Sequence, residues 1–349
     1  MEQIPVTVLT GYLGAGKTTL LNRILSEPHG RKYAVIVNEF GEVGIDNDLV
    51  VGADEEIFEM NNGCICCTVR GDLIRIIAGI MKRAQNFDGI LIETTGLADP
   101  GPVAQTFFAD ADVAARSKLD SIVTVVDAKH LPQRLKDSKE AQEQIAFADV
   151  ILLNKTDLVS PEELKKVEHS IRHINAFARI VHTERCSVSL DKVLGLGSFD
   201  LDRILADKPE FLAGEDHAQP HDGHCHDEHC GHPHHDHGHK HDHKHGHVEE
   251  AGIASVSLVT DKPLDPAKFE NWIGELRANK GQDLLRYKGI LDIAGSNARL
   301  AIQGVHMMME GSNLSPWKDG EKRQSRMVFI GRKLDEKALR EGFASTVSA

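Results

Sequence analysis

The chain has 349 residues, of which 41% are hydrophobic and 27% are charged, as in ordinary soluble proteins of about two domains. Its 53 acidic and 40 basic residues give a formal net charge of −13, which argues against binding nucleic acid or acidic lipid through a basic face. No run approaches the roughly 18 apolar residues of a membrane span, and no basic region precedes the first apolar run. We therefore expect a cytoplasmic protein with neither a nucleic-acid nor a membrane partner.

Strands and helices are expected to alternate over residues 1–205, which we assign to the first domain. Short apolar runs predict strands at residues 6–10, 33–37, 57–60, 89–93, 121–126 and 149–153. Helical periodicity or position predicts helices at residues 17–26, 70–83 and 161–174. Ser160 is the expected N-cap of the last helix, and Pro161 occupies its first helical position. This alternation predicts an α/β fold with a doubly wound, mainly parallel sheet and helices on both faces.

The composition changes abruptly in residues 206–250, which we assign to a linker. Residues 217–247 hold 14 histidines in 31 positions and no Val, Ile, Leu, Met, Phe, Trp or Tyr, so we expect a disordered segment. Residues 251–349 are predicted to form a smaller α+β domain with an antiparallel sheet. Its expected strands are residues 254–260, 284–293, 299–309 and 326–330, and its expected helices are residues 266–278 and 335–343.

Residues 11–18 match the pattern G-x-x-x-x-G-K-[ST] between an expected strand and an expected helix, as in a phosphate-binding loop. Backbone N–H groups of such a loop surround an anion, and the helix N-terminus adds partial positive charge. We expect Lys17 to contact the β- and γ-phosphates and the Thr18 hydroxyl to bind Mg²⁺. The residues expected to hold the nucleotide phosphates are Gly11, Gly14, Ala15, Gly16, Lys17, Thr18 and Thr19.

A second motif, Asn154-Lys155-Thr156-Asp157, follows the expected strand at residues 149–153. The Asp157 carboxylate can accept hydrogen bonds from guanine N1–H and from the exocyclic amine, a donor pair that adenine lacks. Lys155 would lie along the base. The pattern N-K-x-D is common in ordinary turns, but downstream of a phosphate loop it favours GTP over ATP. Asn154, Lys155 and Asp157 are therefore the expected base-binding residues.

Two further segments supply candidate catalytic residues. Glu93 and Gly96 lie at the end of the expected strand 89–93, where a carboxylate can order Mg²⁺ and its waters and the Gly96 N–H can contact the γ-phosphate. Glu39 and Asp46 lie in a segment placed where a nucleotide-sensing loop is expected. The predicted catalytic set is Lys17, Glu39, Glu93 and Gly96. Because no arginine finger or water-orienting glutamine is evident, we expect slow intrinsic hydrolysis.

Three cysteines, Cys64, Cys66 and Cys67, form a C-x-C-C cluster that predicts a site for zinc or another thiophilic metal. Three thiolates leave a fourth position, which could stay open for metal exchange or be filled by Glu39 or a histidine. The alternative is three buried free thiols. The histidine tract at residues 217–247 offers exchanging ligands for zinc, nickel, cobalt or copper, or else serves as a solvated spacer.

Together these motifs resemble the CobW-type family of P-loop GTPases, which includes zinc metallochaperones. The resemblance covers most of residues 4–200 and is carried by residues 11–18, 38–41, 63–67, 93–96 and 154–157. It implies a GTPase that binds GTP and Mg²⁺, holds zinc on Cys64, Cys66 and Cys67, and releases the metal to a client metalloprotein after hydrolysis. The residues that follow the cysteines and Gly96 look more like the zinc-handling branch than the cobalamin-synthesis branch.

Other functions use the same motifs. A cobalt or nickel insertase would differ only in its cargo, because thiolate ligands do not separate zinc from cobalt. A regulatory GTPase would hold zinc only as a structural ion, and a passive metal store would rely on residues 217–247. The client protein is left open, and the sequence is compatible with a homo-oligomer.

Overall fold

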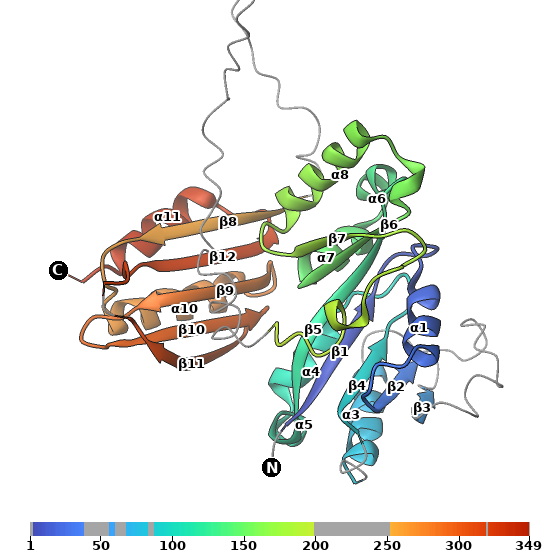
Figure 1. Ribbon diagram of the computed structural model, residues 1–349. Helices are drawn as coiled ribbons and strands as arrows, with labels where there is room; N and C mark the ends of the chain where they lie inside the picture. The colour runs from blue at the N-terminus through green and yellow to red at the C-terminus, as the bar shows by residue number, and fades with distance from the viewer. Residues whose placement is uncertain are drawn as a thin grey trace, which may run out of the picture.

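The computed structural model describes residues 3–37, 56–59, 68–82, 87–198, 252–318 and 320–348. These residues form two β-sheets with their helices (Figure 1). The first sheet has seven strands in the order β3-β2-β4-β1-β5-β6-β7, and all neighbours are parallel. Its strands are β1 (Ile4–Thr10), β2 (Tyr33–Val37), β3 (Glu56–Glu59), β4 (Gly89–Glu93), β5 (Ser117–Asp127), β6 (Val150–Asn154) and β7 (Arg179–His182). The predicted parallel sheet is confirmed.

The register of this sheet gathers the carboxyl ends of β1, β4, β5 and β6 at one edge. Leu9 of β1 lies opposite Glu93 of β4. Asp127 of β5 lies opposite Asn154 of β6. In open α/β sheets, ligands bind outside the carboxyl ends of the strands. The phosphate-loop motif, the segment after Glu93 and the N-K-x-D motif therefore converge at this edge.

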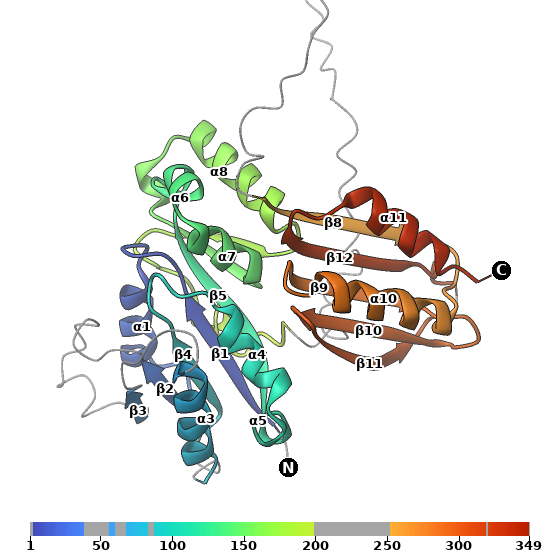
Figure 2. The same cartoon turned by 180° about the vertical axis from the view of Figure 1, so that it is seen from behind.

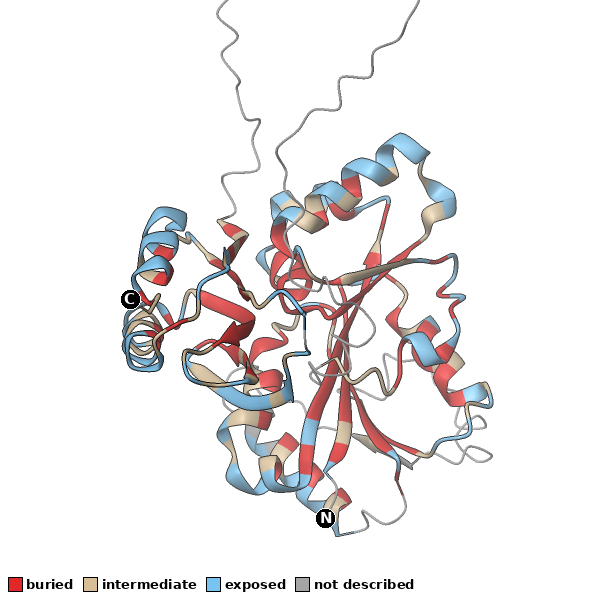
Figure 3. Cartoon of the chain, turned by 60° about the vertical axis from the view of Figure 1, so that its left-hand side comes forward, coloured by how far each residue is buried: buried red, intermediate tan, exposed pale blue. Residues whose placement is uncertain are grey.

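Helices cover both faces of the sheet, as the sequence predicts (Figure 2). One face packs against α1 (Lys17–Ser26) and against apolar residues between Cys186 and Leu194, a stretch that includes the 3₁₀ turn η3 (Leu190–Lys192). The other face carries α3 (Thr68–Met81), α4 (Gly101–Ala109), α5 (Ala111–Arg116), α6 (Leu131–Asp137), α7 (Lys139–Phe147) and α8 (Pro161–Ile174). Figure 3 shows the strands buried along most of their length and the outer faces of these helices exposed.

The second sheet is antiparallel, with five strands in the order β11-β10-β9-β12-β8. Its elements are β8 (Ile253–Thr260), α10 (Pro266–Lys280), β9 (Leu284–Asp292), β10 (Ala298–Val305), β11 (Met308–Pro316), β12 (Ser325–Arg332) and α11 (Glu336–Ser345). Phe269 and Ile273 of α10 and Leu339 and Phe343 of α11 pack on one face of this sheet. The predicted smaller α+β domain is confirmed.

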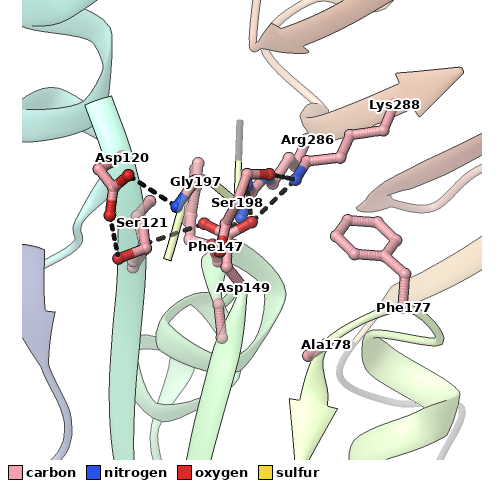
Figure 4. Close-up of polar contacts among 12 residues, drawn as sticks. Asp120, Ser121, Phe147, Asp149, Phe177, Ala178, Gly197, Ser198, Arg286 and Lys288 are labelled. Carbon is pink, nitrogen blue, oxygen red and sulfur yellow. Dashed lines mark hydrogen bonds and ion pairs between the residues drawn. The ribbon is translucent and has the colours of Figure 1, made fainter. Parts of the chain in front are cut away.

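The two units share a buried ionic contact (Figure 4). Asp149, just before β6, accepts hydrogen bonds from Arg286 and, at 2.8 Å, from the ammonium of Lys288, both on β9. Burial alone would raise the pKa of Asp149, but the two cations hold it below its ordinary value. Burial lowers the pKa of Lys288 to about 8, against the opposing effect of Asp149. Apolar contacts accompany this cluster, since Leu285 and Ile330 join the core of the first unit.

Several expected elements have the observed bounds, namely α1, β2, β4 and α8. One expectation is wrong: residues 299–309 are not a single strand but the hairpin β10–β11. His306 makes the turn with a positive φ of 53°, and neither of the residues between the two strands, His306 and Met307, is a glycine, proline or asparagine. The histidine tract lies outside the described residues. Within the part of the chain that is described, no helix is long and apolar enough to span a membrane.

Candidate functional site

The phosphate-loop motif connects the end of β1 to the start of α1, and its glycines have conformations that other residues rarely adopt. Gly11, Gly14 and Gly16 have φ values of 141°, 74° and 120°. At Gly11 a β-carbon would lie 2.3 Å from the carbonyl oxygen of Val125 on β5. Glycine is therefore required both by the backbone and by the close approach of the neighbouring strand.

Lys17 begins α1 and is only 8% exposed. Its ammonium donates a hydrogen bond of 2.8 Å to the carbonyl of Gly11, which folds the side chain back over the loop. Burial lowers the pKa of Lys17 from its ordinary value, and the nearby Glu93 carboxylate opposes that shift. Thr18 is half-buried and Thr19 is exposed beside it. Lys17 and Glu93, both predicted to be catalytic, thus interact electrostatically at the carboxyl edge of the sheet.

Asn154, at the end of β6, joins the phosphate loop to the loop after β7. Its side-chain amide donates to the carbonyl of Ala15 at 2.9 Å. Its side-chain oxygen accepts from the Thr183 hydroxyl at 3.1 Å and from the backbone N–H of Cys186 at 2.9 Å. The buried Asn154 therefore fixes two loops at once, although they are far apart in the sequence.

Lys155 extends across the phosphate loop from a left-handed backbone conformation, with a φ of 61°. Its ammonium donates to the carbonyl of Gly14 at 2.8 Å and to the carboxylate of Asp127 at 2.7 Å. Burial would raise the pKa of Asp127, but hydrogen bonds from Lys155 and His130 outweigh it and lower that pKa. Asp157 lies in the 3₁₀ turn η2 (Thr156–Leu158) and is exposed.

The segment after β4 runs along the phosphate loop. The backbone N–H of Thr94 donates to the carbonyl of Leu9 at 3.0 Å, and the Thr94 hydroxyl donates to that of Thr10 at 2.9 Å. A β-carbon at Gly96 would lie 2.5 Å from the side chain of Leu13 and 2.8 Å from its backbone nitrogen. Gly96 therefore touches the phosphate loop in a way that no residue with a side chain could.

Four residues near this edge were not identified from the sequence: Asp127, Gln144, Thr183 and Cys186. Asp127 and Gln144 line a cavity of about 260 Å³ together with Tyr12 and Leu13 of the phosphate loop. For Asp127, a carboxylate directly after a predicted strand was an available signal. Gln144 and Cys186 carry no local pattern, because their contacts are with residues distant in the chain.

Several predicted site residues lie outside the described residues, namely Glu39, Asp46, Cys64, Cys66 and Cys67. Among the residues that the structure does describe, no group of three or more His, Cys, Asp or Glu could hold a metal ion. The chain resumes with α3 at Thr68, directly after Cys67, and continues into β4. The cysteine motif is thus joined to Glu93 and Gly96 through one helix and one strand.

Comparison with known proteins gives matches along the chain. Residues 5–182 match the family model described as "CobW/HypB/UreG, nucleotide-binding domain", and residues 253–347 match "Cobalamin synthesis protein cobW C-terminal domain". The zinc chaperone YjiA of Escherichia coli (strain K12) is 36% identical over 349 residues, which cover 99% of each chain. The zinc-regulated GTPase metalloprotein activator 1 of Schizosaccharomyces pombe is 46% identical over 191 residues, 52% of this chain and 46% of that protein.

The structures agree as well. The crystal structure of the Zn(II)-bound YjiA GTPase from E. coli superposes with a TM-score of 0.75 at 32% identity and covers the whole of both chains. The fold, the phosphate loop and the C-terminal unit thus all indicate the same family. The chain belongs to the CobW/HypB/UreG family of nucleotide-binding proteins and carries that family's CobW C-terminal domain.

Proposed function

We propose that this protein is a GTP-hydrolysing zinc chaperone. It would bind zinc on Cys64, Cys66 and Cys67 and transfer it to a client metalloprotein. The observation that supports the nucleotide part is that Asn154 ties the phosphate loop to the loop after β7, which keeps the N-K-x-D segment and its Asp157 at the same edge of the sheet as the phosphate loop. The match to a zinc chaperone along 99% of both chains supports the metal part.

The residues at the carboxyl edge have distinct proposed tasks. Lys17 would leave the Gly11 carbonyl and contact the β- and γ-phosphates, and Asp157 would accept the two guanine donors. Mg²⁺, held by the Thr18 hydroxyl, would neutralise charge that develops between these phosphates. Glu93 would order Mg²⁺ and its waters, and the Gly96 N–H would contact the γ-phosphate.

The metal site and the domain limits are also proposals. Glu39 is a candidate for positioning water or for completing the zinc site beside the three thiolates. We propose residues 1–205 as the GTPase domain, 206–250 as a histidine-rich linker that buffers or delivers metal, and 251–349 as the C-terminal domain. A cytoplasmic location suits unoxidised thiolate ligands, because cytosolic cysteines are kept reduced.

The test compares wild-type protein with the Cys66→Ser variant in the apo, Mg²⁺-GDP and Mg²⁺-GTP-analogue states. We expect slow GTP hydrolysis, preference for GTP over ATP, and tighter zinc binding with the GTP analogue. Cys66→Ser should lose the tight zinc site and keep GTP affinity, because the phosphate loop is separate in sequence. Equal zinc affinity in all three states would instead indicate a structural metal, and preference for Co²⁺ at cellular concentrations would indicate a cobalt insertase.

A further inference from the structure

Gln144, on α7, contacts the segment that carries Gly96. Its side chain is buried, with 1% exposed. The amide nitrogen donates two hydrogen bonds, to the carbonyl of Gly96 at 3.1 Å and to that of Ala98 at 3.0 Å. Both donors of one amide are thus used on one short stretch of backbone. This fixes the course of the chain between β4 and α4.

Gln144 is itself held by the sheet. Its backbone carbonyl accepts a hydrogen bond of 2.8 Å from the Thr124 hydroxyl on β5. Thr124, Gln144 and Leu13 of the phosphate loop line one cavity. Gly96 lies directly against Leu13. A shift of the Gly96 carbonyl would therefore move the backbone of Gly96 relative to the phosphate loop. Gln144, anchored to β5 through Thr124, therefore fixes the position of the Gly96 segment beside the phosphate loop.

The residue next to Gln144 contacts the C-terminal domain. Glu143, also buried, forms an ion pair with Arg332 at the end of β12. At the end of α7, the ring of Phe147 lies 5.8 Å from that of His306 in the β10–β11 turn. The same helix thus contacts the Gly96 segment on one side and the C-terminal domain on the other, on the face of the sheet that α4 also occupies (Figure 2).

We propose that Gln144 is a positioning residue for GTP hydrolysis: it holds Gly96 against the phosphate loop, so that the Gly96 N–H meets the γ-phosphate. The Glu143–Arg332 ion pair holds α7, the helix that carries Gln144, against the C-terminal domain. The C-terminal domain therefore contributes to the position of Gly96. This inference rests on the proposed GTPase function. It adds a residue that acts on the nucleotide site through the backbone of the Gly96 segment, and it assigns the C-terminal domain an influence on the hydrolytic site.

The test is Gln144→Leu in the full-length protein, with Gln142→Leu as the matched control. Gln142 lies on the same helix, is also buried, with 6% exposed, and donates to the carbonyl of Leu135, away from the phosphate loop. Both substitutions remove a buried amide of the same helix. We expect only Gln144→Leu to weaken binding of a GTP analogue and to lower kcat, each by about tenfold or more, because two buried carbonyls lose their donors. GDP affinity should change by less than about twofold, since GDP lacks the γ-phosphate.

Two further variants separate positioning from folding. Gln144→Met keeps the length of the side chain, removes both donors and adds no charge, and it should reproduce the loss of GTP-analogue affinity if the leucine variant does not fold. Arg332→Gln should lower kcat in the same direction by a smaller factor. Equal weakening of GDP and GTP analogue, or none, would overturn the role of Gln144. Wild-type protein unable to hydrolyse GTP would instead overturn the proposed function itself.

Discussion

Gly96 shows how one missing side chain can allow two loops to come into close contact. The space that a β-carbon would need is filled by the side chain and backbone nitrogen of Leu13, at 2.5 and 2.8 Å. Leu13 is itself 57% exposed, so the phosphate loop meets the Gly96 segment at the surface rather than within the core. The close approach places the backbone of Gly96 beside the phosphate loop, which suits its proposed role as a donor to a phosphoryl oxygen.

Replacing Gly96 by alanine should therefore impair hydrolysis more than nucleotide binding. The added methyl group must push the segment away from Leu13, so the proposed γ-phosphate contact lengthens. We expect kcat for GTP to fall by about tenfold or more, with GDP affinity retained. Gly79→Ala is the control: it lies inside α3 with open space around it, and alanine favours a helix. A Gly96→Ala enzyme with normal turnover would contradict the assigned role.

At this scale the sequence predicts residues that belong to continuous motifs. Lys17 and Asn154 could be identified because their neighbours in the chain show what they do. Gln144 could not be identified in this way, since it lies 46 and 48 residues from the carbonyls that it binds. Cys186 is similar, because its contact with Asn154 spans 32 residues. Such contacts depend on tertiary packing, which no local pattern records.

Among the helices, α8 has the start that its sequence predicts. The Ser160 hydroxyl accepts from the backbone N–H of Glu163, and the Glu163 carboxylate accepts from the backbone N–H of Ser160 at 2.8 Å. Pro161 follows at the first helical position. These interactions satisfy groups that the first turn of a helix leaves unpaired. The helix is thus specified locally, before any contact with the sheet.

Removing the cap should destabilise α8 by a predictable amount. Ser160→Ala should lower the free energy of unfolding by about 1 kcal/mol, because a first-turn N–H loses its acceptor. Ser170→Ala, within the same helix, should change stability little, since its hydroxyl only returns to the carbonyl of Lys166. Thermal unfolding of both variants gives the comparison. Equal effects at the two positions would show that helix propensity, rather than capping, governs this element.

The helices between β4 and β6 escaped prediction for a physical reason. α4, α5, α6 and α7 have 9, 6, 7 and 9 residues, too short to show a clear apolar period. Only Ser138 separates α6 from α7, and it breaks the helix with an extended backbone. The turn of the β10–β11 hairpin is concealed in another way, because its apolar methionines continue the pattern of the strand.

At the scale of the whole molecule, the two units are joined by ion pairs between charged residues that have no partner nearby in the sequence. Asp149 and its cations, Arg286 and Lys288, are separated by 137 and 139 residues. Each of these charged residues lies in or beside a mostly apolar strand, so in the sequence each one breaks an apolar run without an evident partner. Figure 4 shows these residues together, where the carboxylate of Asp149 neutralises the charges of Arg286 and Lys288. Composition and periodicity predict two units, whereas this contact between them emerges only from the fold.

Asp149→Asn should therefore destabilise the protein strongly. The variant would leave two buried cations without their shared carboxylate, at a cost of about 3 kcal/mol in the free energy of unfolding. Asp261→Asn is the control, because Asp261 pairs with Lys322 at 2.9 Å where both side chains are more than half exposed. That pair should contribute less than about 1 kcal/mol. Chemical denaturation at neutral pH distinguishes the two, and equal losses would contradict a buried joint.

The pH dependence of this difference has a definite sign. The folded protein holds the pKa of Asp149 below its ordinary value of 3.8, because Arg286 and Lys288 outweigh the effect of burial. The unfolded chain therefore binds a proton first as pH falls, so the stabilisation is fully present above that value and is lost below it. Below about pH 4, wild-type protein should therefore lose stability more steeply than Asp149→Asn, which has no carboxylate to protonate at this position. Equal losses of stability in the two proteins below about pH 4 would mean that Asp149 is not held ionised in the native state and that its ion pairs do not join the domains.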